Sequence, residues 1–506
     1  MKRNLRYMAI MAAMVAANAN AQDAYNLTSL TSSDLNGTAR YVGMGGAMNA
    51  LGADISTMQS NPAGIGLYRK GDCAFSLSNN TGDESRKFLN KGENFVSFDQ
   101  LGVVFSFEVG DSPEYFNIGF NYHKDKAYHN VFFDARALGP GLSQTYQMEE
   151  LFKSPGQDYY TGRSVSDMAE FGYQTGLLAK DEKGNYIGIG ASEYGFKKYE
   201  RGSRNQLDFS LAFNFDNQFY FGAAVGCSFL SHEIASLYSE ENADGGYDLS
   251  NYLKTTGTAV DFKVGAIIRP IEDNPFRFGI SISTPTAYYM KVDNGFASID
   301  VNENIEGYHS REMGAFINDY RIETPWKFGL SAATTVGTQF AIDAEYEYQD
   351  WSSLKYKYDD DVEDAVVTGL NSEMLKGVST FKIGAEYKVT PKLSLRAGYN
   401  YVSPMFYENS YRNLDPDNSR YAASGSDAIY TLTSTDFSNL YGINRYTCGI
   451  GFRFTKAYLD FAYQLSSQKG EFYAFDDYQP QASRKLMPTS FTNKRNQVLL
   501  TLGYKF

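Results

Sequence analysis

The sequence predicts an all-β protein: a closed barrel of fourteen antiparallel strands that spans a membrane and encloses its own N-terminal segment. Three observations support this fold class. Apolar and polar side chains alternate with a period of two along many short stretches, the pattern of strands with two different faces. The connections between these stretches alternate between short and long, and the number of stretches is even, as in bacterial transmembrane barrels.

The composition agrees with a large folded β-protein. The chain has 506 residues, of which 43% are hydrophobic, 15% aromatic and 21% charged. Its 40 Tyr and 36 Phe argue against a disordered chain. Beyond the N-terminus no run of 18 apolar residues occurs, so no transmembrane helix is predicted. A formal net charge of -13 makes nucleic acid an unsuitable partner.

The first 21 residues have the features of a signal peptide. Lys2, Arg3 and Arg6 precede a short apolar run, and Ala19-Asn20-Ala21 is typical of a cleavage site. We therefore expect residues 1–21 to be removed on export. Three scattered cysteines, Cys73, Cys227 and Cys448, predict neither a disulfide framework nor a metal site.

The barrel wall is predicted from the alternating stretches. In residues 207–215, for example, Leu207, Phe209 and Leu211 alternate with smaller or polar residues. The fourteen predicted strands are 73–79, 101–109, 116–122, 207–215, 219–229, 260–268, 276–282, 326–332, 340–348, 381–387, 393–401, 446–454, 459–465 and 498–506. Residues 73–506 thus form the barrel.

The connections fall into two groups. Six of them have at most seven residues, and seven have at least 21, including an 84-residue connection at 123–206. Tyr and Trp residues stand at the long-connection ends of the strands, where an aromatic girdle belongs. The last strand alternates up to the terminal Phe506, which resembles the signal by which outer-membrane barrels are recognised for assembly.

Charged side chains occur on the face opposite the apolar one. A charge near the middle of a membrane is tolerated only when it faces a lumen. Their mixed signs predict ion pairs between neighbouring strands, because an unpaired charge in a confined lumen is costly. The lumen charges that we single out are Lys327, Asp343, Glu345, Glu347, Lys382, Glu386 and Arg396.

Residues 22–72 precede the first strand and lack its alternation. They are rich in small residues, and their spacing does not match a phosphate-binding loop. Tight packing in a confined space explains the small residues better. The distinctive motif comprises Gly43, Gly45, Gly46, Asp54, Asn61, Pro62, Ala63 and Gly64.

This motif resembles the N-terminal hatch of the FadL/TodX family of outer-membrane transporters for hydrophobic compounds. Further similarity lies in residues 324–329 and 395–401. The resemblance implies a monomeric barrel in the outer membrane of a Gram-negative-type bacterium, plugged by residues 22–72. It also implies passage of long-chain fatty acids or similar apolar compounds by energy-independent diffusion. The implied partners are the ligand, outer-membrane lipids and the barrel-assembly machinery.

Two features of the long connections leave alternatives open. An amphipathic helix at 164–180, with Met168, Phe171, Thr175 and Leu178 on one face, is either a flap for ligand capture or a helix packed on neighbouring loops. The acidic run at 359–364 is either a Ca²⁺ site or a solvated loop, and the solvated loop is the preferred interpretation.

An enzyme is not expected. The four histidines, His123, His129, His232 and His309, all fall in predicted loops, and none lies in a nucleophile motif. No cofactor or metal is predicted. The alternative function is a barrel associated with type IX secretion that acts as a protein shuttle or interaction platform, because fold alone does not decide function.

Overall fold

A computed structural model of the chain describes residues 23–82, 94–109, 114–139, 141–153, 167–242, 245–302, 310–313, 318–412, 433–475 and 486–506. The predicted signal peptide and His309 lie outside the described residues. No helix among these residues combines the length and the apolar character needed to cross a membrane.

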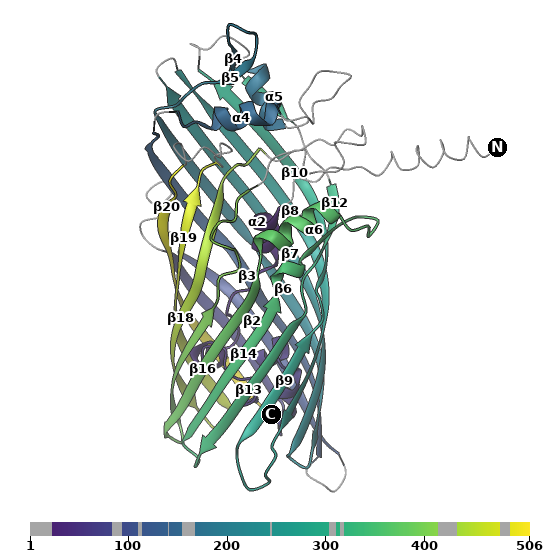
Figure 1. Ribbon diagram of the computed structural model, residues 1–506. Helices are drawn as coiled ribbons and strands as arrows, with labels where there is room; N and C mark the ends of the chain where they lie inside the picture. The colour runs from purple at the N-terminus through teal and green to yellow at the C-terminus, as the bar shows by residue number, and fades with distance from the viewer. Residues whose placement is uncertain are drawn as a thin grey trace, which may run out of the picture.

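The described strands close into a barrel with a fourteen-stranded antiparallel wall, as predicted (Figure 1). The first and last strands complete the ring, with Phe75 opposite Leu502. Two of the wall strands are each interrupted at a Pro, at residues 284–286 and 324–326, and so carry two labels. The wall consists of β1 (Asp72–Gly82), β2 (Asn94–Val109), β3 (Glu114–Ala137), β6 (Glu193–Phe215), β7 (Phe219–Asn242), β8 (Gly245–Ile268), β9 with β10 (Arg277–Ser283, Ala287–Val301), β12 with β13 (Asn318–Glu323, Lys327–Val336), β14 (Phe340–Asp350), β16 (Gly377–Thr390), β17 (Leu393–Val402), β18 (Phe437–Arg453), β19 (Ala457–Tyr473) and β20 (Thr489–Lys505).

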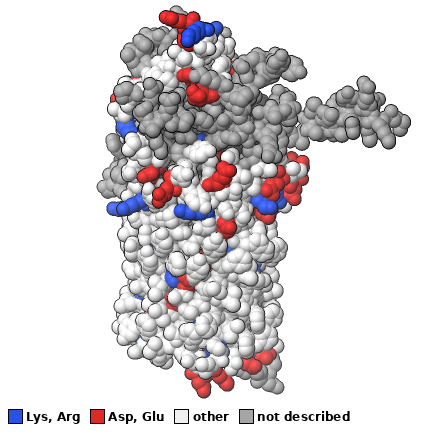
Figure 2. Space-filling view, viewed as in Figure 1, with Lys and Arg blue, Asp and Glu red and all other residues white. Residues whose placement is uncertain are grey.

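The two faces of the wall differ as the alternation predicts. Outward side chains of the lower wall are large and apolar, and Leu330, Val498 and Phe262 are each more than half exposed. The lower wall is nearly free of charged groups on the visible face, while Lys, Arg, Asp and Glu gather above it and at the bottom rim (Figure 2). Trp326, half exposed, stands at the upper border of this band, and Phe454 stands at the lower one. This arrangement places the uncharged band in the hydrocarbon layer.

Several wall strands are about twice as long as predicted. The predicted 84-residue loop at 123–206 is wrong at both ends, since β3 continues to Ala137 and β6 begins at Glu193. A bilayer needs about ten residues per strand, whereas β3, β7 and β8 each have 24. Above the membrane the outward face no longer has to be apolar, so the ladder continues after the alternation has ended.

The connection between β6 and β7 is a tight turn at the bottom of the barrel. Asp216 and Asn217 join β6 to β7, and both have positive φ angles of 52° and 55°. Asn and Asp tolerate this left-handed conformation, and the resulting turn matches the twist of the paired strands.

Residues 23–71, which we call the lumen segment, run inside the barrel (Figure 1). Its helices are α2 (Ala24–Thr31), α3 (Ala39–Gly43), η1 (Ile55–Gln59) and η2 (Pro62–Leu67). Helix α3 contacts β17 to β20, whereas η2 contacts β3, β6, β7 and β8 on another part of the wall. The segment therefore crosses the lumen before the chain enters β1.

A small cap lies over the upper mouth of the barrel (Figure 1). It contains α4 (Gln144–Lys153), α5 (Asp167–Gln174), β4 (Leu178–Lys180) and β5 (Tyr186–Gly188). The predicted helix at 164–180 is too long at its C-terminal end, because Gly176 takes a positive φ of 77° and Leu178 starts a strand. Its apolar face is buried among cap and wall residues, as in the packing alternative.

The remaining elements cover one side of the upper wall. They are β11 (Ser310–Met313), η4 (Trp351–Ser353), β15 (Lys355–Tyr358) and α6 (Ala365–Met374). Trp351 and Leu354 pack with α2 in an apolar cluster inside the barrel. The upper lumen is therefore filled partly by α2 and partly by wall side chains.

Candidate functional site

The small-residue motif folds into short helical turns that are capped by its own polar residues. Asp54 caps η1 and accepts a hydrogen bond from the Thr38 hydroxyl at 2.8 Å. Asn61 caps η2 by accepting from the Ala63 backbone N–H, and its amide donates to the Asn49 carbonyl at 3.0 Å. Pro62 follows at the first helical position, where its missing N–H costs nothing.

The motif glycines permit close contact with the wall. Gly45 and Gly46 have φ angles of 66° and 77°, which favour glycine. A Cβ on Gly45 would lie 2.9 Å from the Tyr399 backbone nitrogen. Gly43 faces Gly449 of β18, whose Cα would be 3.4 Å from an added Cβ. The lumen segment and the wall thus approach each other backbone to backbone.

Two of the predicted lumen charges hold the lumen segment directly. Glu345 accepts the backbone N–H groups of Met48 and Asn49, each at 2.5 Å. Asp343 accepts those of Ala50 and Leu51 at 3.1 and 2.8 Å. Four consecutive N–H groups of the segment are therefore bound by carboxylates from β14.

Four of the other lumen charges belong to two buried groups on the same side of the wall: Glu347, Lys382, Glu386 and Arg396. Lys382 lies 3.3 Å from Glu345 and 2.7 Å from Glu347. Arg396 contacts Glu386 at 2.6 Å and Asp460 at 2.7 Å.

The lumen segment joins the second group, because Arg40 lies 3.1 Å from Glu386 and donates to the Ala53 carbonyl. Lys327 is half-buried at the start of β13, opposite Gln349.

Sequence reasoning missed part of this interface. Asp460 and Arg40 complete the second ion group, but neither stands out in the sequence. Wall glycines were missed as well: a Cβ on Gly384 or Gly398 would strike the backbone of Met44 or Gly45. A glycine on the polar face of a strand, where a side chain is otherwise expected, could have indicated that another backbone approaches closely there.

Asn61 and Pro62 provide a test of the motif. We expect the double substitution Asn61→Ala and Pro62→Ala to loosen the lumen segment, since losing a helix cap costs about 1 kcal/mol. More frequent openings in single-channel recordings in planar bilayers are the expected readout. Asn185→Ala, in an exposed turn of the cap, is the control. Recordings that match the unmodified protein would show that these two residues do not hold the segment.

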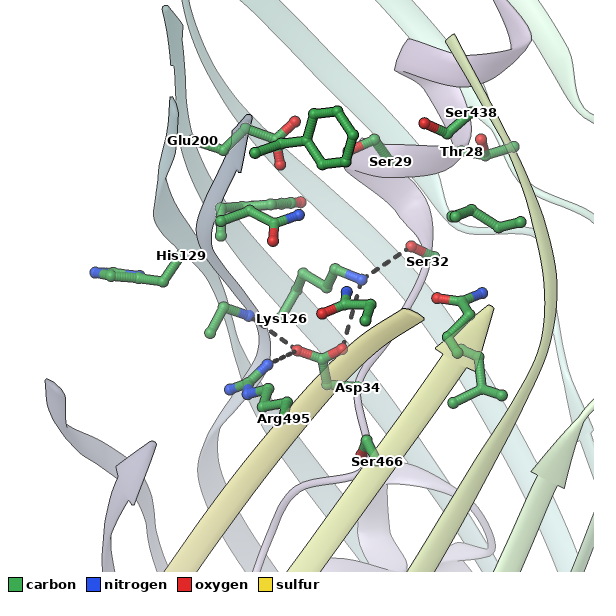
Figure 3. Close-up of a pocket in the computed structure, with 18 of the residues that line it drawn as sticks. Thr28, Ser29, Ser32, Asp34, Lys126, His129, Glu200, Ser438, Ser466 and Arg495 are labelled. Atoms are coloured by element: carbon green, nitrogen blue, oxygen red, sulfur yellow. Dashed lines mark hydrogen bonds and ion pairs between the residues drawn. The ribbon is translucent and has the colours of Figure 1, made fainter. Parts of the chain in front are cut away.

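A cavity of 410 Å³ lies above this interface, between the lumen segment and the upper wall (Figure 3). One end is polar and basic. Asp34 of the lumen segment lies 3.5 Å from Lys126 and 3.0 Å from Arg495. Lys124, Arg445 and Lys494 also line the cavity. Although burial by itself raises the pKa of a carboxyl, Lys126 and Arg495 hold the pKa of Asp34 well below its usual range.

The other end of the cavity is aromatic. Tyr25 of α2 stacks on Phe406 with a centroid distance of 4.5 Å, and Phe437 lies beside Tyr25 at 5.4 Å. Phe132 contacts Phe472 and Phe491 at 4.5 and 5.3 Å. The cavity therefore offers both a cationic surface and an apolar one.

The positions of three histidines differ from the prediction. His123 and His129 lie on β3 and His232 on β7, because those strands extend into the predicted loops. His123 is buried, 3.2 Å from Asp208, whereas His232 packs on the Tyr128 ring at 4.3 Å. His129 and His232 line the cavity.

The acidic run is engaged with neighbouring cations. Asp361 lies 3.3 Å from Arg321, and Glu363 lies 3.1 Å from Lys355. Within the described part of the chain, no group of three or more His, Cys, Asp or Glu side chains is placed to hold a metal ion.

Comparison with known proteins finds one family that part of the chain resembles. Residues 198–428 match the model of the outer membrane protein transport family described as OMPP1/FadL/TodX. No curated protein matches the sequence significantly.

The fold is that of solved transport channels. A Pseudomonas aeruginosa FadL homologue is 13% identical with a TM-score of 0.51, covering 94% of this chain and 99% of its own. The monoaromatic hydrocarbon channel CymD is 12% identical with a TM-score of 0.50, covering 95% and 99%. The P. putida toluene transporter TodX is 13% identical with a TM-score of 0.50, covering 93% and 99%. The match over residues 198–428 and the closed barrel together show that the chain resembles the outer-membrane β-barrel proteins of the OMPP1/FadL/TodX family.

Proposed function

We propose that the protein carries hydrophobic compounds with an acidic group, such as long-chain fatty acids, across the outer membrane by diffusion. The observation that carries the proposal is the cavity, which joins a basic end to an aromatic end inside the barrel. Each buried CH₂ of a ligand contributes about 0.8 kcal/mol, so an alkyl chain is drawn from water into the aromatic end. A carboxylate would meet Lys124, Lys126, Arg445 and Arg495. The described lining holds seven Lys and Arg side chains but three carboxylates, Asp34, Glu200 and Asp436.

The lumen segment acts as a hatch in this proposal. The interface of this segment with β14, β17 and β18 fills the lower lumen at the level of Asp343 and Gly398. The barrel is therefore not suited to free diffusion of hydrophilic solutes. No energy source is required, because a channel needs only binding that is favourable and still weak enough to allow release. Residues 22–72 are thus assigned to the hatch, and a monomer embedded in outer-membrane lipids is the proposed functional unit.

Lys124 allows the head-group contact to be tested without breaking an ion pair of the lumen segment. Its Nζ donates to the Ser97 hydroxyl at 2.6 Å and it lines the cavity. Charge-assisted hydrogen bonds contribute about 1.5–3 kcal/mol. We therefore expect Lys124→Met to weaken binding of a labelled long-chain fatty acid about tenfold in lipid nanodiscs, with little change for the fatty alcohol of equal length. Lys291→Met, at an exposed site on β10, is the matched control.

Uptake by cells decides between this function and the secretion alternative. Deleting the gene should reduce uptake of the labelled fatty acid, and Lys124→Met should restore it less well than Lys291→Met. If uptake of every apolar probe is unchanged while secretion of cargo proteins collapses, the transport proposal is wrong. If Lys124→Met weakens binding of the fatty acid and of the fatty alcohol equally, Lys124 does not recognise an acidic head group. That result would leave the transport of hydrophobic compounds itself uncontradicted.

A further inference from the structure

The cap closes the upper mouth through an apolar core that it shares with the wall. Met148, Met168 and Phe171 of the cap are fully buried against β6, β7, β8, β10 and β19. Phe472 of β19 belongs both to this core and to the lining of the cavity. The core of the cap and the cavity therefore adjoin at Phe472, with the cap on the side of the upper mouth.

One carboxyl group ties the cap to the wall. Glu240 of β7 is only 3% exposed. It accepts hydrogen bonds from the Gln144 backbone N–H at 2.5 Å and from the Ser143 hydroxyl at 2.6 Å. These groups form the beginning of α4, so the Glu240 side chain holds the first turn of the cap's main helix.

The Gln144 side chain reinforces the same contact. Its amide donates to the Thr435 hydroxyl at 2.6 Å, and its carbonyl accepts from the Tyr247 hydroxyl at 2.8 Å. The first turn of α4 is thus bound to three separate parts of the chain: β7, β8 and Thr435, which lies two residues before β18 begins. Lifting the first turn of α4 therefore breaks the contacts with Glu240, Tyr247 and Thr435 together.

In the part of the chain that the structure describes, no cation pairs with Glu240. The titratable groups that face it are Tyr238 of β7, whose hydroxyl donates at 2.5 Å, and Tyr247 of β8; Tyr194 of β6 lies behind Tyr238. On the cap side, the described groups that face it are the Gln144 backbone N–H and the Ser143 hydroxyl, and neither of them titrates. Burial raises the pKa values of Tyr238 and Tyr247 well above 10, so both stay neutral. No Lys, Arg or His in the described residues forms an ion pair with Glu240.

Glu240 stands eleven residues above the lipid-facing Phe229 and so lies outside the membrane. Burial raises its pKa to about 7, despite the hydrogen bonds from Gln144 and Ser143 that act in the opposite direction. A buried carboxyl without a cation is disfavoured in its ionised form.

We propose that Glu240 is a proton-controlled latch: its neutral form keeps the cap closed over the cavity, and its ionised form releases the cap. The latch describes the movement of the cap alone. It rests on the proposed function only for the identity of the ligand that passes when the cap is open. When the cap lifts, water reaches the carboxylate and removes the cost of its charge. Opening therefore becomes easier as the pH rises.

The direction follows from linkage. The closed state binds the proton more tightly than the open state, in which Glu240 is solvated with a usual pKa near 4.5. The contribution of the proton to closure is therefore fully present below that value and decreases as the pH rises towards 7. Above about pH 7 the equilibrium constant for opening of the cap levels off. Its value there is up to about two orders of magnitude higher than below about pH 4.5.

Hydrogen exchange in the α4 backbone tests the latch in the full-length protein in nanodiscs. After correction for the intrinsic rate, we expect the exchange of residues 145–152 to rise by up to about two orders of magnitude between pH 4.5 and 8. Glu240→Gln should stay protected at every pH, because an amide cannot ionise. Glu241→Gln is the matched control, since the Glu241 side chain is the exposed neighbour on the same strand, and it should behave as the unmodified protein.

The outcomes separate the latch from the proposed function. Exchange that does not depend on pH in the unmodified protein, or that depends on pH equally in Glu240→Gln, overturns the latch. If Glu240→Gln does not fold, Glu240→Leu provides a second chain that cannot ionise at this position. A pH-dependent cap in a protein that binds no fatty acid would retain the latch and refute the transport proposal.

Discussion

Replacing Gly398 with valine is expected to drive the lumen segment out of its place and open a conducting pore. Gly398 faces the lumen from β17, and even one added carbon would overlap the backbone of Met44 and Gly45. Backbone cannot move aside as a flexible side chain can, so the overlap has to be relieved by displacing the segment. We expect large, long-lived conductance steps in planar bilayers, compared with brief openings for the unmodified protein.

Gly195→Val is the control for this experiment. Gly195 lies on β6 in the upper wall, and nothing stands within 4 Å of a Cβ added there. This variant should therefore keep the conductance of the unmodified protein. A Gly398→Val protein that remains closed, with its lumen segment still protected from protease, would mean that the wall glycines do not fix the segment.

Replacing Arg396 with methionine is expected to cause the largest loss of stability. The Arg396 side chain is completely buried and contacts two carboxylates, Glu386 at 2.6 Å and Asp460 at 2.7 Å. Removing the cation leaves both carboxylates buried, with Arg40 at 3.1 Å from Glu386 and Arg453 at 3.8 Å from Asp460 as the remaining cations. Breaking a buried ion group in this way costs about 3–5 kcal/mol of the free energy of unfolding, which urea titration in lipid vesicles measures.

A surface ion pair of the same chain gives the comparison. Arg201 pairs with Glu233 at 2.9 Å, but its side chain is 55% exposed, and such pairs contribute about 1 kcal/mol or less. Arg201→Met should therefore change the unfolding midpoint little. Adding Glu386→Gln and Asp460→Asn to Arg396→Met should recover part of the loss. Equal effects of the two Met variants would show that the buried group is not important for stability.

The transmembrane wall was predictable from the sequence because its physics is local. A strand with lipid on one side and a lumen on the other must alternate, and this requirement acts on each residue separately. The fourteen-strand barrel is confirmed on that basis. The extensions of β3 and β6 were not predictable, since water surrounds the upper wall and places no such demand on the outward residues from Lys124 to Ala137.

The lumen face was predictable only in part. The charges of β14, β16 and β17 could be placed on one face from their spacing. In the structure, Glu345 and Asp343 accept hydrogen bonds from four backbone N–H groups of the lumen segment. The donors that bind these two carboxylates were not predictable, because Met48 and Glu345 are almost 300 positions apart in the sequence. The hatch role of the motif residues stays a prediction.

The sequence by itself determined the strand count, the lipid-facing surface and the presence of a separate small-residue segment before the wall. These follow from the membrane, whose hydrocarbon layer acts uniformly on every strand. Only the tertiary structure decided the cavity, where Asp34 from the lumen segment meets Arg495 from the last strand, and the cap contact of Glu240. Both depend on side chains from distant parts of the chain that meet only when the barrel has closed, and no local pattern encodes such a meeting.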